Sequence, residues 1–273
     1  MRFRDIPRYS MNLVGSDDLR QRGILAMEMM DSVRDDPRRL QPHFHDFFQM
    51  YWLEGSTGVM IDFEEFSISG THVVFLYPGQ VHTLRPGDLS GTTVSFTQAF
   101  FDGRTPPPSR LLGFPFFLPD GTASSFAVPP EVVPEIRGLF KALVAEYSRA
   151  LPDAEEMLRA TLWLLLLKLA RLSPQYGDRQ AAGRARALVR QFSLAVEESF
   201  REEHSLGFYA KRLGVTANHL NDTVREQTGA SAGEMVRLRR LLDAKRLLLH
   251  SDLSIAEIGY QIGFKEPSYF ARF

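Results

Sequence analysis

Hydrophobic and polar positions follow two different patterns along the chain. From about Gln41 to Phe101, apolar runs such as FFQMYWL and THVVFLY are separated by EGSTG, ISG and RPGD. Alternation with a period of two, interrupted by glycine and proline, predicts about six short strands in a small sandwich or barrel. The preceding segment, Met1–Leu13, is expected to be a flexible arm. The glycines expected in turns are Gly55, Gly58, Gly70, Gly79 and Gly87.

After Pro130 the period becomes helical. The segments Glu131–Ala150 and Asp153–Leu172 carry broad apolar stripes and predict two long helices. The stretch that follows is small, polar and glycine-bearing, which is typical of a linker. We therefore predict an α+β chain of two domains. A β-barrel followed by helices spans residues 1–172, a linker spans 173–184, and an all-α domain spans 185–273.

The all-α domain is predicted to hold short helices around one long helix, Ala232–His250. Thr216 and Ser254 suit helix N-caps, because a hydroxyl oxygen accepts a hydrogen bond from a backbone N–H of the first turn. Gly229 suits a C-cap, because glycine adopts the left-handed conformation at little cost. The last predicted helix is interrupted by the end of the chain at Phe273, so we expect the domain to be truncated there.

One pattern occurs twice in this domain: a short helix, a turn with glycine and a second helix. The two copies are LGFYAKRLGVTANHLNDTVREQTG and SIAEIGYQIGFKEPSYFARF. The packing positions Ala210, Leu213, Val215 and Leu220 of the first copy correspond to Gly259, Ile262, Phe264 and Phe270 of the second. Together with the stretch RRLLDAKRLLLHSDLSIAEIGYQIGF, they resemble the AraC/XylS family of regulators, in which a long helix joins two helix-turn-helix units.

The resemblance implies that the second helix of each unit enters a major groove of DNA. The two units would then read sites about one turn of DNA apart, roughly 34 Å. Asparagine pairs well with adenine, arginine with guanine and aspartate with the N4 amine of cytosine. The positions carried over are Asn218, Asn221, Asp222, Ser268 and Arg272 for base contacts, and Arg225 and Lys265 for phosphate contacts.

Charge and composition change this picture little. From Arg184 to Phe273 there are 14 basic and 11 acidic residues, against 18 and 22 in the remainder, so the helical third is mildly basic. The chain has no cysteine, which excludes disulfides, thiolate metal ligands and a cysteine nucleophile, and suits a reducing cytoplasm. The most apolar run, Leu162–Leu167, is far shorter than the roughly 20 residues that cross a bilayer, so no membrane segment is predicted.

In the strand region, HFHDFFQ and PGQVH look like the two motifs of cupins, whose enzymes hold a metal with histidines and a glutamate. Alternation places His43, His45 and Gln49 on the strand face that lines the lumen. Gln49 occupies the glutamate position, and a neutral amide is a poorer metal ligand than a carboxylate. Three interpretations stay open for the histidines: structural hydrogen bonding, ligand contact and metal binding. The candidate ligand contacts are His43, His45, Phe47, Gln49, Tyr51, Tyr77 and His82, and we predict no metal and no cofactor.

We predict a DNA-binding transcription regulator rather than an enzyme, with a cupin-like sensor domain, acting in the cytoplasm as a ligand-responsive dimeric activator. Its partners would be double-stranded DNA, a small-molecule effector, a second copy of the chain and, by family resemblance, RNA polymerase. The dimer contact is expected on the stripe Leu158, Leu162, Leu165 and Leu166. Two alternatives remain: a metal-dependent cupin enzyme with a helical appendage, and a regulator whose barrel binds a protein partner.

Overall fold

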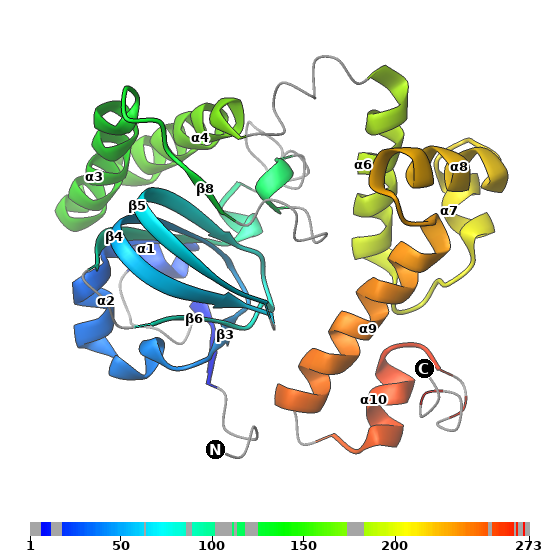
Figure 1. The fold of residues 1–273 in the computed structure, drawn as a ribbon. Coiled ribbons are helices and arrows are strands. Elements are labelled where there is room, and N and C mark those ends of the chain that lie inside the picture. Colours follow the sequence, from blue (N-terminus) through cyan, green and yellow to red (C-terminus); the bar gives the residue numbers. More distant parts are fainter. Residues whose placement is uncertain are drawn as a thin grey trace. The chain divides into compact units, whose positions relative to one another are not determined.

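The chain divides into two compact units near residue 176. The computed structural model describes residues 7–11, 18–62, 64–85, 89–101, 111, 114–117, 125–173, 183–250, 253–264, 266 and 270. The first unit is built on a sheet and the second is helical, which confirms the predicted α+β fold class (Figure 1). Most of the predicted linker, residues 174–182, lies outside the described residues.

A six-stranded antiparallel sheet forms the centre of the first unit. Its order is β2-β7-β4-β5-β8, and β6 also pairs with β4. One edge of β4 pairs with β7 over residues 48–55 and then with β6 over residues 59–61, so the sheet curls (Figure 1). The strands are β2 (Ile24–Glu28), β4 (Phe48–Ile61), β5 (Glu64–Leu76), β6 (His82–Leu84), β7 (Leu89–Phe96) and β8 (Ser125–Ala127).

The hairpin of β4 and β5 is longer than the predicted strands. Gly55 and Gly70 pair with each other inside it, and their φ angles are 123° and 86°. Only glycine adopts such angles at little cost, so the two residues bend the hairpin without ending its strands. The expectation of turns at Gly55, Gly58 and Gly70 is therefore wrong. Gly79 does lie in a turn, with a φ of 84°, and Gly87 lies outside the described residues.

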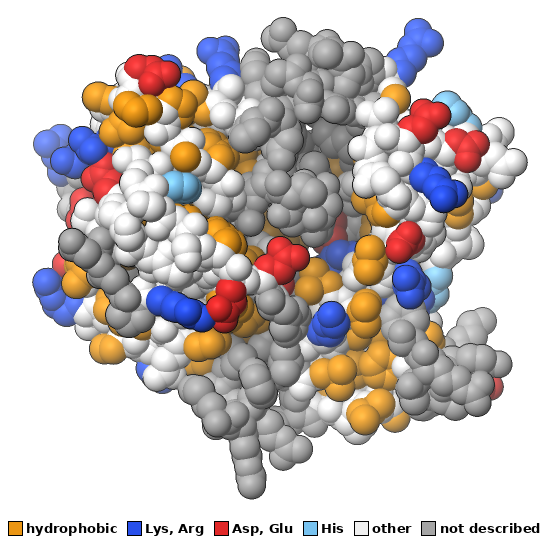
Figure 2. Space-filling model, viewed as in Figure 1, with side chains coloured by type: hydrophobic (Ala, Val, Ile, Leu, Met, Phe, Trp, Pro, Cys, Tyr) orange, Lys and Arg blue, Asp and Glu red, His pale blue; other side chains and the backbone are white. Residues whose placement is uncertain are grey.

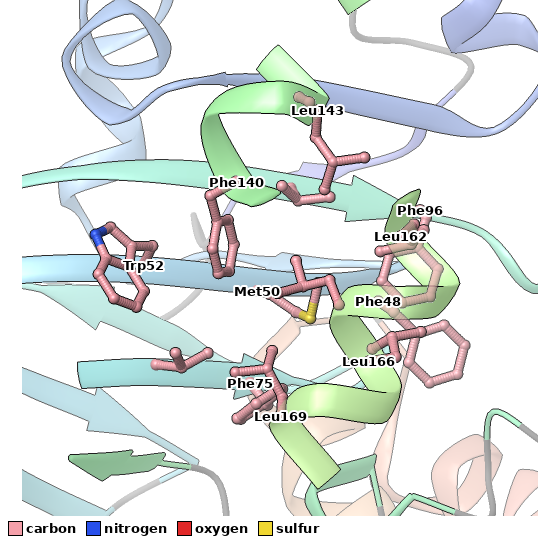
Figure 3. Close-up of a cluster of buried hydrophobic side chains, with 14 of the residues drawn as sticks. Phe48, Met50, Trp52, Phe75, Phe96, Phe140, Leu143, Leu162, Leu166 and Leu169 are labelled. Atoms are coloured by element: carbon pink, nitrogen blue, oxygen red, sulfur yellow. The ribbon is translucent and has the colours of Figure 1, made fainter. Parts of the chain in front are cut away.

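Helices α3 (Val133–Arg149) and α4 (Ala154–Leu172) cover one face of the sheet (Figure 1). Side chains alternate between the two faces of a strand, so every second residue of β4 points toward these helices. Figure 3 shows Phe48, Met50 and Trp52 packed with Phe75, Phe96, Phe140, Leu143, Leu162, Leu166 and Leu169. The short 3-10 helices η4 (Gln98–Phe101) and η6 (Pro115–Phe117) add further phenylalanine rings to this core.

The leucine stripe predicted for dimerisation belongs to the same core. Leu158, Leu162, Leu165 and Leu166 are each 0% exposed. A second copy of the chain cannot reach them, so this part of the dimer prediction is wrong. The sequence pattern misleads here because a helix that covers a sheet needs as broad an apolar stripe as one that pairs with another helix.

Residues 7–11, which belong to the segment predicted to be a flexible arm, are also more ordered than expected. β1 (Arg8–Tyr9) pairs in parallel with β3 (Phe44–His45), and Met11 is buried. The expectation of a flexible arm is therefore wrong for residues 7–11. Between this segment and the long hairpin lie three short helices: α1 (Asp18–Gln21), α2 (Met29–Asp35) and the 3-10 helix η3 (Pro37–Leu40).

The second unit contains, within the described ranges, α6 (Gly183–Ser199), α7 (Leu206–Arg212), α8 (Ala217–Thr228), α9 (Ala232–His250) and α10 (Ile255–Gln261). Phe192, Tyr209 and Leu220 join α6, α7 and α8 in one core. Ala244 and Ile258 join α9 and α10 in another. Hydrophobic side chains also reach the surface over α9 and α10 (Figure 2). None of the described helices has the length and apolarity needed to cross a membrane.

The predicted helix caps are confirmed. The Thr216 hydroxyl accepts a hydrogen bond from the His219 N–H at 3.2 Å, at the start of α8. Ser254 and Glu257 form a capping box on α10. Gly229 ends α8 with a φ of 80°. These caps satisfy backbone groups that a helix end leaves without partners, and so they help to determine where α8 begins and ends and where α10 begins.

Candidate functional site

The sheet face opposite α3 and α4 borders a cavity of about 200 Å³. β4 and β7 contribute one wall, and β1, β2, α2 and η3 contribute the others. A small cavity with apolar walls and a few placed polar groups is typical of a small-molecule site. The apolar lining consists of Met11, Leu25, Met29, Met30, Val33, Leu40, Phe47 and Leu84.

The polar wall follows from strand register. Gln49 faces Ser95 across β4 and β7, and Tyr51 faces Thr93, so their side chains emerge on the same face. The Gln49 amide donates to the Ser95 hydroxyl at 2.9 Å. The Thr93 hydroxyl is buried and has no hydrogen-bond partner among the described residues. Leaving such a hydroxyl group unpaired costs about 1–3 kcal/mol. The Thr93 hydroxyl is therefore available to form a hydrogen bond with a ligand.

Three histidines lie together at this wall: His43 and His45 line the cavity, and His82 is buried beside them. His43 and His82 are bridged by two backbone hydrogen bonds, and their ring centroids are 4.2 Å apart. The His45 and His82 rings are 4.9 Å apart. His45 Nε2 lies 3.0 Å from the Gln49 amide oxygen, and the Tyr51 hydroxyl lies 3.4 Å from His82 Nε2. The rings therefore hold one another, and the neighbouring strands, in register.

Burial keeps these rings uncharged. It lowers the pKa of His43 to about 4 and that of His45 to about 3. It also lowers the pKa of His82 well below its ordinary value, and the neighbouring His43 and His45 lower it further. Neutral imidazoles can lie within 5 Å of one another without electrostatic repulsion. The cluster consequently supplies hydrogen bonds to the cavity wall but no charge at neutral pH.

The Nδ1 atom of each ring lies within hydrogen-bond distance of a backbone carbonyl. The distance is 2.8 Å for His43, 2.7 Å for His45 and 3.2 Å for His82. Across the part of the chain that the structure describes, no group of three or more His, Asp or Glu side chains is placed to hold a metal ion. This geometry favours structural hydrogen bonding and ligand contact over metal binding.

One charged side chain does line the cavity from the opposite side. Arg39, in η3, donates to the Ser32 hydroxyl at 2.6 Å and to the Ser32 carbonyl at 3.3 Å. Its guanidinium lies 5.5 Å from the centroid of the Tyr9 ring. The Tyr9 hydroxyl in turn donates to Asp36 at 2.9 Å. β1, α2 and η3 are thus tied together at the rim of the cavity.

The predicted ligand contacts divide into three groups in the structure. His82 is buried behind Tyr51 and touches the other histidines. Tyr77 points the other way, and its ring packs at right angles on Phe48, on the side of α3 and α4. The β4–β5 register explains this, because Gln49 faces Leu76 and Tyr51 faces Val74, which places odd-numbered residues at the end of β5 on the opposite face. The contacts that do line the cavity are His43, His45, Phe47, Gln49 and Tyr51.

In the second unit, α8 carries the predicted base-reading residues of the first helix-turn-helix. Asn218, Asp222 and Arg225 are exposed. Asn221 is half-buried, and its side-chain oxygen accepts a hydrogen bond from the Ala232 N–H at 3.2 Å. Asn221 therefore connects α8 to the start of α9, a structural role that the sequence did not indicate. Lys265, Ser268 and Arg272 lie outside the described residues.

Helix α9 is held firmly on both sides. Arg201 donates two hydrogen bonds to Asp243, at 2.9 and 3.1 Å. Arg239 forms an ion pair with Glu197, and both side chains are at most 10% exposed. Arg240 donates to the Ile262 carbonyl at 2.9 and 3.1 Å, next to α10. These contacts tie α9 to α6, to Arg201 just after it, and to the end of α10.

Two comparisons with known families cover most of both units. A model of the AraC-like ligand binding domain matches residues 32–167, which include the cavity walls on η3, β4 and β7 and the part of α2 that begins at Ser32. A helix-turn-helix domain model matches residues 209–273. The chain belongs to the AraC family of transcriptional regulators. The predicted family is confirmed, and with it the prediction of a DNA-binding transcription regulator that has a ligand-binding domain.

Individual AraC family members are similar over most of the chain. The HTH-type transcriptional activator RhaS of Citrobacter koseri is 26% identical over 235 residues, which are 84% of this chain and 81% of RhaS. RhaS of Escherichia coli O81 is 27% identical over 252 residues, 88% and 86% of the two chains. Among solved structures, ToxT of Vibrio cholerae O395 has a TM-score of 0.44 at 13% identity, over 92% of this chain and 90% of ToxT.

Membership of the AraC family disfavours the metal-dependent enzyme that the cupin motifs left open. The cavity residues that the sequence analysis missed are chiefly Tyr9, Arg39 and Thr93. The alternation that places Ser95 beside Gln49 also places Thr93 beside Tyr51, so the β7 pattern contained a signal for Thr93. The sequence around Arg39 and Tyr9 contains no such signal, because these residues reach the cavity only through the tertiary packing of η3 and β1.

Proposed function

We propose that this AraC family member is a homodimeric transcriptional activator whose activity changes when a small molecule binds in the cavity of the first unit. The observation that supports this most directly is the cavity itself. Most of its lining residues lie within the match to the AraC-like ligand binding domain, and it has an apolar wall and a polar wall. Such a cavity can bury a small ligand almost completely.

The DNA-binding part of the proposal rests on α8. Its exposed residues Asn218 and Asp222 would read base edges in a major groove, and Arg225 would contact phosphate. Lys265, Ser268 and Arg272 are proposed to act in the same way from the second helix-turn-helix. The firm attachment of α9 supports a fixed spacing of roughly 34 Å between the two reading helices.

The dimer is proposed to form through a different face of α4 from the predicted one. Met157, Leu164 and Leu167 are 50%, 44% and 38% exposed. Positions separated by seven and three residues lie on one side of a helix, so these side chains form an exposed apolar strip beside the buried stripe. A second copy of α4 running alongside would cover both strips at once, as in an isologous interface.

The activator role is drawn from the relatives, which are named transcriptional activators. It implies contact with RNA polymerase on DNA and a cytoplasmic location.

A regulator controlled by a protein partner is the second candidate. The buried, unpartnered Thr93 hydroxyl favours a small molecule over a protein, because a protein partner cannot reach a side chain that is 2% exposed.

Native mass spectrometry of the full chain, combined with a reporter gene, tests this proposal. We expect an organic molecule to remain bound in the native spectrum and to be lost on denaturation. Val33→Phe places a ring in the cavity and should abolish both the bound mass and the transcriptional response. Val132→Phe, at a half-buried position outside the cavity, is the matched control and should retain both. An unchanged bound mass in Val33→Phe would contradict the proposed site, and a bound metal ion would revive the enzyme alternative.

A further inference from the structure

The cavity contains one positive charge that the described part of the chain does not neutralise. Arg39 makes its hydrogen bonds to Ser32, and no described carboxylate lies within ion-pair distance of its guanidinium. None of the residues that line the cavity is acidic. The Arg39 guanidinium is half-buried, and its side chain lines the cavity.

The neighbouring charges are already paired. Asp36, three residues before Arg39, accepts two hydrogen bonds from the Arg38 guanidinium at 2.9 Å and one from Tyr9. Arg85, the other cation of the lining, is paired with Glu65 at 2.5 Å. Arg39 is therefore the one described cation of the wall whose charge is available to a ligand.

Most of the remaining polar groups of the cavity already form hydrogen bonds within the protein, so few are left to bind a ligand. Gln49 is bonded to Ser95 and His45, and Tyr51 is close to His82. The Thr93 hydroxyl alone is buried without a partner in the described wall. A ligand rich in hydroxyl groups would leave most of them unpaired against Met29, Leu25 and the other apolar side chains, which disfavours a sugar or polyol.

We infer that the effector is a small carboxylic acid with an apolar body, and this inference rests on the proposed function of the cavity. The carboxylate pairs with the Arg39 guanidinium, since two parallel N–H donors match its two oxygens. The Thr93 hydroxyl donates to a ligand oxygen. The hydrocarbon part lies against the apolar lining. The ion pair forms at a half-buried guanidinium, where a charge-assisted hydrogen bond is stronger than in bulk water.

Calorimetric titration of the full chain with matched acids and amides tests this assignment. The probes are 3-phenylpropanoate, cyclohexanecarboxylate and hexanoate, each compared with its neutral primary amide, which has nearly the same shape. We expect at least one acid to bind about tenfold or more tightly than its amide, as the loss of a charge-assisted hydrogen bond implies.

Two variants of Arg39 separate charge from structure. Arg39→Gln should weaken the acid by about tenfold or more and leave the amide unchanged. Arg39→Lys keeps a positive charge and should recover part of the affinity for the acid. Arg34→Gln, on the exposed side of α2 and outside the cavity, is the matched control and should change neither.

The outcomes separate the effector class from the site. An amide that binds as tightly as its acid, or equal losses for both probes in Arg39→Gln, would overturn the carboxylate and leave the cavity as a site for neutral ligands. No binding of any probe at millimolar concentration would overturn the effector cavity together with the carboxylate.

Thr93→Val tests the hydroxyl. It should weaken the binding of acid and amide alike by about tenfold while raising the unfolding temperature of the free protein. A lower unfolding temperature would remove Thr93 from the assignment.

Discussion

At the scale of single residues, the histidine cluster links the cavity wall to pH. In the unfolded chain the three rings would titrate near pH 6.5, whereas burial lowers the pKa of His43 to about 4 and of His45 to about 3 in the folded unit. Between pH 4 and pH 6.5, the histidines of the unfolded chain bind more protons than those of the folded unit. The stabilisation is therefore complete above pH 6.5 and is lost as the pH falls toward 4.

We expect the thermal unfolding midpoint of the first unit to fall steadily between pH 6.5 and pH 4. The shift at His43 alone corresponds to about 3 kcal/mol. Circular dichroism melts across this range measure the effect. His45→Gln removes one titrating ring and should make the dependence shallower. A midpoint that does not change between pH 6.5 and pH 5 would contradict the buried, neutral state of the cluster.

Gly263 shows how one residue fixes the second helix-turn-helix. Its φ is 85°, and a Cβ atom there would lie 2.0 Å from the Arg201 carbonyl oxygen and 2.5 Å from His204 Nε2. Gly263→Ala should therefore destabilise the second unit by about 2 kcal/mol or more in urea unfolding, through strain and a backbone clash. Gly233→Ala, in α9, meets nothing within 4 Å and should leave stability unchanged or slightly higher. Equal stabilities of the two variants would show that the close approach does not constrain the fold.

At the scale of elements, α8 combines two roles that the sequence alone did not separate. Asn221 accepts a hydrogen bond from the Ala232 N–H, whereas Asn218 is exposed on the same helix. Asn221→Ala should lower the stability of the second unit by about 1 kcal/mol, and Asn221→Asp, which keeps an acceptor oxygen, should lower it less. Asn218→Ala should leave stability unchanged and relax the preference for one base pair by about 1–3 kcal/mol.

Urea unfolding and competitive DNA binding with single base-pair substitutions measure the two effects separately. Asn218→Ala with an unaltered preference at every base pair would remove Asn218 from the proposed interface. A fully stable Asn221→Ala would show that the link between α8 and α9 contributes little.

At the scale of the whole molecule, the proposed dimer depends on the exposed strip of α4. Leu164→Glu and Leu167→Glu place a charge on that strip and should convert the dimer to a monomer, with affinity lost for paired sites but not for a single site. Light scattering after size-exclusion chromatography reports the mass. Leu151→Glu, which is also exposed but lies before α4, is the control and should remain dimeric. A wild-type chain that is monomeric at micromolar concentration would contradict the dimer.

The sequence by itself determined the secondary structure of the described part of the second unit, its caps and its family. Helical period, Thr216, Gly229 and Ser254 act within a few residues of one another, so their effects can be read locally. Alternation also predicted that His43, His45 and Gln49 face the same way, and all three line the cavity, although His45 lies on β3 and Gln49 on β4. Local spacing is visible in the sequence because neighbouring residues share one backbone geometry.

The tertiary structure alone decided which surfaces face the cavity, the core and the solvent. Tyr77 was assigned to the wrong face because the register of the β4–β5 hairpin depends on where its turn falls, and Gly55 and Gly70 bend the strands instead of ending them. Arg39 reaches the cavity only because η3 packs beside it. The leucines of α4 are buried by a sheet that lies far away in the sequence. Such contacts join residues without any fixed spacing along the chain, so no local pattern encodes them.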